Sequence, residues 1–218
     1  MNSQKTATPL SLLLLGATGA VGQQVLSAAL ADARIANVIA PTRRPLPPHP
    51  KLINPAIDFA DLPDDSPWWK VDAVICALGT TLKLAGSKAA FATIDRDLPI
   101  QIAKLARQAG ATSLALNSSL GAHPAGNFYL RTKAQAEAGI RALGYACYTI
   151  VRPSIIDAVR PELRLGEVLG LSLAKLSRPL IPRRYRAVKA ARIASALLEG
   201  VLRQEVGEWI VESAQLQD

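Results

Sequence analysis

Apolar residues occur along this chain in short continuous runs, and turn-forming residues follow each run. Runs of this length, bounded by turn residues, are typical of strands that are buried on both faces of a sheet. The predicted strands cover residues 10–15, 36–40, 51–54, 72–77, 112–117, 146–151 and 208–211.

Between these runs, apolar residues recur at helical spacing. One stripe begins at Val21 and ends near Ala33. Residues 87–110 are predicted to be helical with a kink or break at Pro99, because proline removes a backbone hydrogen bond. Strands that alternate with helices predict an α/β fold, a single doubly wound parallel sheet with helices on both faces. Further helices are expected from near residue 127 and over residues 163–176 and 187–202.

A glycine-rich turn, GATGAVG, follows the first predicted strand and opens the first helix. Gly16 allows a sharp turn, Gly19 lacks a Cβ where a pyrophosphate would approach, and Gly22 allows close packing of helix on strand. The helix N-terminus offers free N–H groups and the positive end of its dipole to phosphates. The turn therefore predicts dinucleotide binding, against the alternative of a purely structural turn. The residues expected at the cofactor here are Gly16, Thr18, Gly19, Ala20, Val21 and Gly22.

Two arginines follow the second predicted strand, where an acidic residue would bind the ribose 2′-hydroxyl of NAD. Arg43 and Arg44 cannot accept that hydrogen bond, but a guanidinium can pair with a 2′-phosphate. The sequence therefore predicts NADP(H), with NAD(H) as the second choice. The alternative is that these arginines only solubilise a loop. Asp58 and Phe59 follow the third predicted strand, where such folds often contact the adenine.

The later predicted strands also end in residues suited to a ligand. Parallel strands present their carboxyl ends at one edge of the sheet, and ligands bind there where the strand order reverses. We therefore expect one site at this edge. It would include Leu78, Gly79, Thr80, Ser118, Ser119, Pro153 and Ser154.

Tyr129 and Lys133 are four residues apart in a predicted helix and so share one face of it. A tyrosine with an ordinary pKa of about 10 is a poor acid near neutrality. A lysine ammonium one turn away favours the phenolate and would lower that pKa. A serine hydroxyl from the end of the fifth strand would then hold a substrate oxygen beside the tyrosine.

Together these motifs resemble the short-chain dehydrogenase/reductase superfamily, specifically its atypical members, the Tat-interacting-protein oxidoreductase-like proteins. The resemblance covers nearly the whole chain. It is carried by GATGAVG at Gly16, TRRP at Thr42, CALGTT at Cys76, AGSKAAF at Ala85, NSSLGA at Asn117, FYLRTKAQAE at Phe128 and VRPS at Val151.

The resemblance implies an NAD(P)-binding Rossmann fold with a Ser-Tyr-Lys catalytic set. Tyr129 would be the proton donor, Lys133 the orienting cation and a ligand of the nicotinamide ribose, and Ser119 the residue that holds the carbonyl. The sequence leaves Ser118 open as the alternative serine. Pro153 and Ser154 would flank the nicotinamide.

These residues predict an NADP(H)-dependent oxidoreductase for a small carbonyl or alcohol substrate. The substrate pocket would be built largely by a small segment near residues 154–186. The competing hypothesis is a regulatory or sensor protein that binds NADP(H) without turnover. An intact Tyr129 and Lys133 weigh against it, since a pure sensor does not need the pair.

The chain has 218 residues and is 50% hydrophobic, so we expect a single domain over residues 1–218 with a substantial core. No apolar stretch approaches the roughly 20 residues that span a bilayer. The leucine-rich run at residues 10–15 is shorter than the apolar region of a usual signal peptide. The sequence therefore predicts a soluble, cytoplasmic protein with no membrane partner.

The cysteines and histidines are not arranged as a metal site. Cys76 and Cys147 lie in apolar runs, where cysteine usually behaves as a small buried hydrophobe. His49 and His123 lie next to prolines in predicted loops, without clustered carboxylates. We therefore expect no metal and no disulfide.

The formal net charge of +8 is concentrated in residues 160–203, with ten Lys or Arg against three Glu. The basic residues are spread over several predicted elements with few interleaved aromatics. This pattern favours a solvated face that also attracts an anionic cofactor or substrate over a nucleic-acid surface. The expected partner is a small-molecule substrate, with no specific nucleic acid, and a homodimer is left open.

Overall fold

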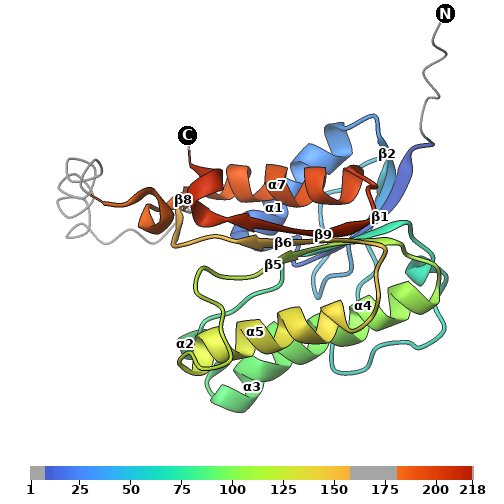
Figure 1. The fold of residues 1–218 in the computed structure, drawn as a ribbon. Coiled ribbons are helices and arrows are strands. Elements are labelled where there is room, and N and C mark those ends of the chain that lie inside the picture. The colour runs from blue at the N-terminus through green and yellow to red at the C-terminus, as the bar shows by residue number, and fades with distance from the viewer. Residues whose placement is uncertain (1–7, 158–180, 218) are drawn as a thin grey trace, which may run out of the picture.

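Seven parallel strands form the central sheet of the computed structural model, which describes residues 8–157 and 181–217 (Figure 1). The strand order is β3-β2-β1-β4-β5-β6-β9. A separate two-stranded parallel ladder follows β6 in the chain and pairs β7 with β8. The strands are β1 Leu10–Leu15, β2 Ile35–Ile39, β3 Leu52–Ile53, β4 Ala73–Cys76, β5 Ser113–Asn117, β6 Cys147–Arg152, β7 Ile156–Asp157, β8 Val188–Lys189 and β9 Gly207–Glu212.

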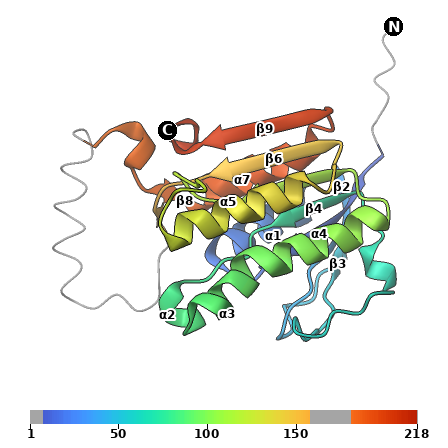
Figure 2. The ribbon, with the colours of Figure 1, turned by 60° about the horizontal axis from the view of Figure 1, so that its bottom comes forward.

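Helices cover both faces of the sheet, which confirms the predicted α/β class (Figure 1). Helices α1 (Ala20–Ala31) and α7 (Ala190–Leu202) pack against each other on one face. Helices α4 (Leu98–Gln108) and α5 (Phe128–Arg141) lie side by side on the other (Figure 2). Two short helices precede α4 in the chain, α2 (Leu82–Ala85) and α3 (Lys88–Ala92).

Strand β1 is almost entirely apolar because both faces of the sheet are covered at this strand. Successive side chains of a strand point to opposite faces of the sheet. Leu12 and Leu14 therefore join the core beneath α1 and α7, whereas Leu13 and Leu15 join the core beneath α4 and α5. All four are fully buried, and the polar residue of the strand, Ser11, is half-buried near its start, where its hydroxyl donates to Oδ1 of Asn37 at 2.6 Å.

All seven strands expected from the apolar runs are present, each within one residue of its predicted ends. Helix α7 begins three residues later than predicted, at Ala190, because the preceding residues form β8. The sequence pattern did not predict α2 or the β7–β8 ladder, whose elements have only two to four residues each. The helix predicted over residues 163–176, and part of the segment near 154–186, lie outside the described residues.

The helical segment predicted to kink or break at Pro99 does not break there, since α4 continues through this residue. Instead, a π-helical turn, Thr93–Asp97, joins α3 to α4 just before this proline. Proline has no N–H to donate, and its ring clashes with the carbonyl four residues earlier, which belongs to Asp95. The wider π-helical turn accommodates the proline ring, and the Asp95 side chain projects from this turn.

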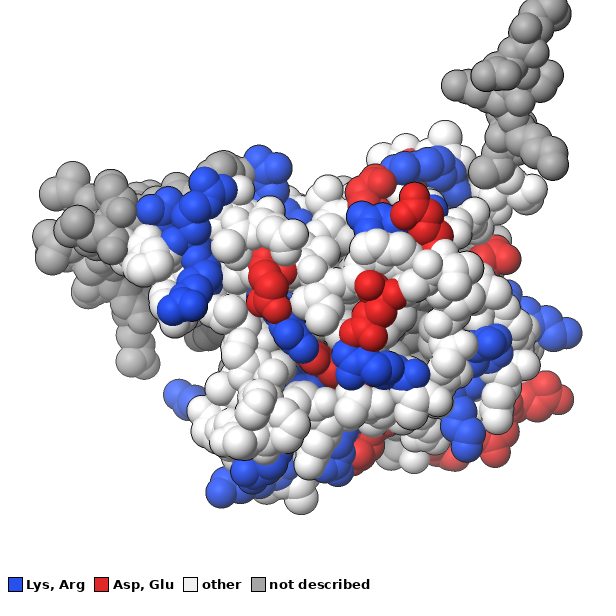
Figure 3. Space-filling model, viewed as in Figure 1, with Lys and Arg blue, Asp and Glu red and all other residues white. Residues whose placement is uncertain are grey.

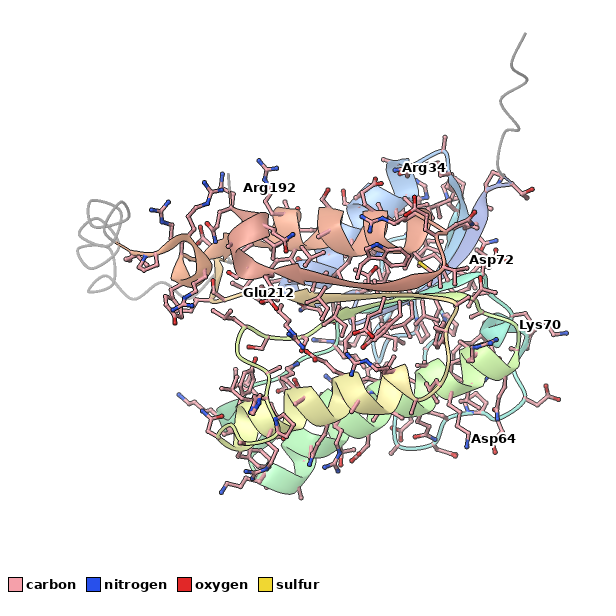
Figure 4. The ribbon with its side chains drawn as sticks, in the orientation of Figure 1. Arg34, Asp64, Lys70, Asp72, Arg192 and Glu212 are labelled. Carbon is pink, nitrogen blue, oxygen red and sulfur yellow. The ribbon has the colours of Figure 1, made fainter. Side chains whose placement is uncertain are left out.

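The strand order reverses between β1 and β4, because the chain runs from β1 outward to β3 and then returns to the other side of β1. In open parallel sheets, ligands bind outside the carboxyl ends of the strands at such a point. Figure 4 shows the two edges of the sheet: Asp72 precedes β4 at the amino edge, and Glu212 ends β9 at the carboxyl edge.

Candidate active site

The glycine turn between β1 and α1 forms a cradle that other residues could not form. Gly16 has φ +81°, and a Cβ added to it would lie 2.6 Å from the carbonyl oxygen of Ala77. A Cβ on Gly22 would lie 1.9 Å from the carbonyl oxygen of Gly16, so the first turn of α1 rests directly on the glycine turn. The Gly19 N–H closes the turn by donating to the Gly16 carbonyl at 2.9 Å.

Helix α1 begins at Ala20 with Gly19 as its N-cap, and no side chain caps it. The first N–H groups of a helix have no partner within the helix. A Cβ on Gly19 would have only the Gly16 carbonyl oxygen close to it, at 3.3 Å, so the space beyond it is open. This uncapped helix end fits the pyrophosphate of a dinucleotide, as the glycine spacing predicts.

Three hollows adjoin one another along the carboxyl edge of the sheet. The inner hollow, of about 180 Å³, lies between the glycine turn and the loop after β2. It shares Thr18 and Leu78 with a central hollow of about 450 Å³. The central hollow in turn shares Ser118 and Tyr129 with an outer hollow of about 750 Å³. Because neighbouring hollows share lining residues, we describe the three together as the cleft.

The inner hollow contains only some of the residues that the sequence assigned to the adenosine end. Arg43 and Phe59 line it together with Gly16 and Thr18. Its lining does not include Arg44, which is exposed. Nor does it include Asp58, whose carboxylate accepts a hydrogen bond from the Ala60 N–H at 2.9 Å.

The central hollow brings together residues from several parts of the chain. Its walls include the start of α1, the loop after β4, helix α2, the π-helical turn, the end of β5, helix α5 and β7. Asn117 Oδ1 is buried there and has no hydrogen-bond partner among the described residues. The sequence-predicted members of this wall are Thr18, Gly19, Ala20, Val21, Leu78, Gly79, Thr80, Ser118, Tyr129 and Lys133.

Lys133 is held in this hollow by a buried ion pair. Its Nζ lies 2.6 Å from Oδ1 of Asp95, and the two side chains are 7% and 1% exposed. The same Nζ lies 6.0 Å from the centre of the Tyr129 ring, one helical turn away. Burial lowers the pKa of Lys133, but Asp95 and Tyr129 raise it by more, so the pKa lies above its ordinary value. The lysine is therefore an ammonium at neutral pH.

Asp95 is not among the site residues predicted from the sequence, although its position in an apolar stripe distinguishes it. Asp95 lies at helical spacing from Phe91, Leu98 and Ile102, which are all buried. A carboxylate within an apolar stripe is costly to bury unless it has a partner. Such a residue can therefore be recognised as a candidate for an ion pair.

The adjacent serines Ser118 and Ser119 have different surroundings. The Ser118 hydroxyl donates to Oε1 of Glu137 at 2.5 Å, and this buried carboxylate also accepts two bonds from Arg152. The Ser119 hydroxyl has one long contact, 3.4 Å to the carbonyl oxygen of Leu120, and it lines the outer hollow. Both serines therefore line the cleft, but the Ser118 hydroxyl is engaged by Glu137 in a hydrogen-bond network, whereas the Ser119 hydroxyl has only the long contact.

This network also joins three elements around the cleft. Arg152, at the end of β6, pairs with Glu137 of α5 at 2.6 Å and with Glu212 of β9 at 3.1 Å. Like Asp95, Glu137 is a buried carboxylate that the sequence analysis did not identify.

The outer hollow has polar groups at one end and apolar walls elsewhere. Ser118 and Tyr129 lie at its junction with the central hollow, and Ser119 lines the outer hollow only. Pro153 and Ser154 follow β6 along one side, and the Ser154 hydroxyl donates to the carbonyl of Arg186. None of the described residues that line this hollow is charged. Its apolar wall is formed by Leu82, Leu120, Ile155, Ile156 and Tyr185.

Both cysteines are free and buried in strands, as predicted. Among the described residues, no group of three or more metal-binding side chains lies together. Within the same residues, no helix combines the length and hydropathy needed to cross a bilayer.

A family model described as NAD(P)H-binding matches residues 16–168. The chain is 33% identical over 171 residues to Protein fmp52, mitochondrial, of Emericella nidulans, covering 73% of this chain and 72% of that protein. It is 32% identical over 166 residues to Protein HTATIP2 of Rattus norvegicus, covering 73% and 68%. These matches confirm the resemblance that the motifs indicated.

Solved structures with little sequence identity share the fold. The enzyme WbmG of Bordetella bronchiseptica, solved in complex with NAD and UDP, aligns with a TM-score of 0.66 at 15% identity, covering 97% of this chain and 75% of that one. MoeE5, solved with UDP-glucose and NAD, aligns with a TM-score of 0.68 at 17% identity, covering 92% and 74%. At such identities the likeness concerns the Rossmann-type fold alone.

The cytoplasmic location expected from the sequence is wrong by this comparison. The relatives from Emericella nidulans and Candida albicans are both named as mitochondrial proteins. The expectation rested on the lack of a membrane-spanning apolar run, and that pattern reports on insertion into a bilayer rather than on the compartment.

Proposed function

The chain belongs to the NAD(P)H-binding family, and from this premise we propose that it is an NADP(H)-dependent oxidoreductase that acts on a small carbonyl or alcohol substrate. The observation that carries the proposal is the position of Tyr129 and Lys133. Tyr129 lines both the central and the outer hollow, and Lys133 lies behind it in the central one. A proton donor at this junction would face a nicotinamide on one side and a substrate on the other.

The described residues fit a dinucleotide along the cleft. The uncapped N-terminus of α1 would bind the pyrophosphate, and the missing Cβ of Gly19 leaves room for it. Arg43 in the inner hollow would pair with a 2′-phosphate, which supports NADP(H) over NAD(H). Lys133 and the unpartnered oxygen of Asn117 would meet the nicotinamide riboside.

A bound nicotinamide supplies or accepts the hydride of such a reaction. In the reductive direction, negative charge develops on the carbonyl oxygen of the substrate. The Tyr129 hydroxyl would donate its proton to this oxygen, and the Ser119 hydroxyl would hold the oxygen in place by a hydrogen bond. The Lys133 ammonium would stabilise the phenolate that Tyr129 becomes. Ser119 is preferred over Ser118 because the Ser118 hydroxyl already donates to Glu137.

The apolar wall of the outer hollow supports an uncharged substrate. Leu82, Ile155 and Tyr185 are 42%, 74% and 50% exposed, although large apolar side chains are usually buried. An aldehyde, ketone or quinone with an apolar body would cover them and exclude water from the carbonyl.

A substrate panel tests this proposal. Aldehydes, ketones and quinones are each mixed with the protein and NADPH, and the absorbance of the reduced nicotinamide is followed. We expect oxidation of NADPH with at least one apolar carbonyl compound. Tight NADPH binding without turnover on any member of a broad panel would favour the regulatory alternative instead.

A further inference from the structure

We propose that Asp95 is a positioning residue of the active site, which holds Lys133 beside Tyr129 and joins it to the loop after β4. The proposal deepens the proposed function, since it concerns the lysine of the same Ser-Tyr-Lys set. It is carried by the two oxygens of one buried carboxylate, which bind two different elements.

Each oxygen of Asp95 has its own partner. Oδ1 lies 2.6 Å from Nζ of Lys133, on helix α5. Oδ2 accepts a hydrogen bond of 2.9 Å from the backbone N–H of Thr80, in the loop after β4. That loop lines the central hollow through Leu78, Gly79 and Thr80, so the carboxylate links the cofactor loop to the catalytic helix.

The loop leaves room for this arrangement. A Cβ added to Gly79 would lie 3.8 Å from Oδ1 of Asp95, which is ordinary van der Waals contact. Asp95 therefore reaches the backbone of the loop without a steric clash. Its carboxylate lies in the wall of the central hollow and holds the Thr80 N–H from there.

The backbone at Asp95 is specialised for this role. Asp95 lies within the π-helical turn Thr93–Asp97, and single π-turns inside α-helices occur often at functional sites. Pro99 prevents a regular hydrogen bond to the carbonyl of Asp95 and so maintains the irregular turn. The side chain leaves from the widened turn toward both partners.

The charge of Asp95 matters because of what surrounds Lys133. The other titratable groups facing the ammonium are Tyr129 on α5 and Cys76 on β4. Burial raises the pKa of the Cys76 thiol to about 11, so the thiol is neutral near pH 7. Among these groups of the described residues, Asp95 is therefore the one negative charge that compensates for the burial of the Lys133 ammonium. Removing one member of such a pair leaves the other charge buried and unpaired.

The direct test is the titration of Lys133 itself, which needs neither a substrate nor a cofactor. Lysines are labelled with ¹³C at Cε, the Lys133 signal is assigned with Lys133→Arg, and its shift is followed against pH. In the unaltered protein we expect Lys133 to stay protonated above the ordinary lysine value of about 10.4. A midpoint at or below that value would overturn the proposal without any variant of Asp95.

The variant Asp95→Asn keeps the size of the side chain and removes its charge. We expect the Lys133 midpoint to fall by at least one pH unit, to below the values of the exposed lysines, because burial then acts without compensation. Asp97→Asn is the matched control on the same turn, since Asp97 is exposed and pairs with Arg96 instead. Asp95→Glu, which restores the charge, should keep the midpoint high.

The pH dependence of turnover is a second measurement, independent of the Lys133 titration. With a substrate from the panel, Asp95→Asn should move the alkaline limb of the kcat/KM profile to lower pH, whereas a purely structural role would lower the rate without moving that limb. A shifted Lys133 titration with no turnover on any substrate supports the role of Asp95 and counts against the proposed function. An unshifted titration in folded Asp95→Asn counts against Asp95 alone.

Discussion

Hydroxyl groups of neighbouring residues at this site have different hydrogen-bond partners, and we expect them to have different roles. Ser118 and Ser119 are adjacent in the sequence and both line the outer hollow, yet only the Ser118 hydroxyl donates to a buried carboxylate. Tyr129 lies at the junction of the two larger hollows, with an ammonium one helical turn behind it. These differences lead to predictions that single substitutions can test.

Tyr129→Phe removes one hydroxyl and leaves the ring to pack against Phe91, whose centre is 5.7 Å away. We expect turnover to fall by about 10² to 10⁴-fold, the usual contribution of a positioned proton donor. NADPH affinity should change little. Lys133→Ala should reduce both turnover and affinity, because the lysine is assigned to the tyrosine and to the nicotinamide ribose. Unmodified turnover in the Phe variant would show that Tyr129 is not the donor.

The two serines form a matched pair for the same measurements. Ser119→Ala should reduce turnover with little change in the midpoint of urea unfolding. Ser118→Ala should instead lower the free energy of unfolding by about 1 to 3 kcal/mol, because Glu137 loses a buried hydrogen bond. If Ser118→Ala abolishes turnover and Ser119→Ala does not, the assignment of the two serines must be reversed.

At the scale of whole elements, the loop after β2 is the segment that would select the cofactor. Both side chains are exposed, but Arg43 lines the inner hollow and Arg44 does not. The two adjacent arginines therefore differ in their access to a bound adenosine ribose.

Binding titrations should show tighter binding of NADPH than of NADH. Arg43→Glu should shrink this difference by about tenfold or more, since it removes a charge-assisted pair with the 2′-phosphate and introduces repulsion. Arg44→Glu, the control in the same loop, should have the smaller effect. Equal affinities of the unaltered protein for the two cofactors would refute the prediction of NADP(H) selectivity.

The elements also show what could be predicted from the sequence and what could not. Strands such as β1 and β4 were predictable because both of their faces are buried, which makes them continuously apolar. Helix α2 and the β7–β8 ladder are too short to show a period. The glycine turn and the Tyr129–Lys133 pair could be predicted because their residues lie close together in the sequence. Asp95 and Glu137 could not, because their partners come from other elements and only the fold brings them together.

Over the molecule as a unit, basic side chains lie on several parts of the surface, and one group of them lies beside the outer hollow. Arg183 and Arg184 belong to a 3₁₀ turn beyond the outer hollow, and Figure 3 shows Lys and Arg side chains gathered in this part of the surface. Toward the middle of the same view, acidic side chains lie among the basic ones (Figure 3). On the face seen in Figure 3, the basic side chains of the described residues therefore do not form a continuous stripe.

We expect nucleic-acid affinity to be weak, to lack sequence preference and to collapse as salt rises, because only counterion release would drive it. Fluorescence anisotropy with labelled DNA and RNA duplexes over a range of salt concentrations measures this directly. A tight and sequence-selective complex at physiological salt would refute the interpretation of this charge as a solvated face.

The apolar wall of the outer hollow bears on how such a protein can diverge. Ile155 belongs to a loop and Tyr185 to a 3₁₀ turn, both outside the seven-stranded sheet, whereas Tyr129, Lys133 and Asp95 lie on helical segments. Substitutions in the wall can therefore accumulate without disturbing the residues proposed to handle the proton and the cofactor. Descendants of one ancestral gene can inherit the same chemistry intact while each lineage adapts the wall to a different metabolite.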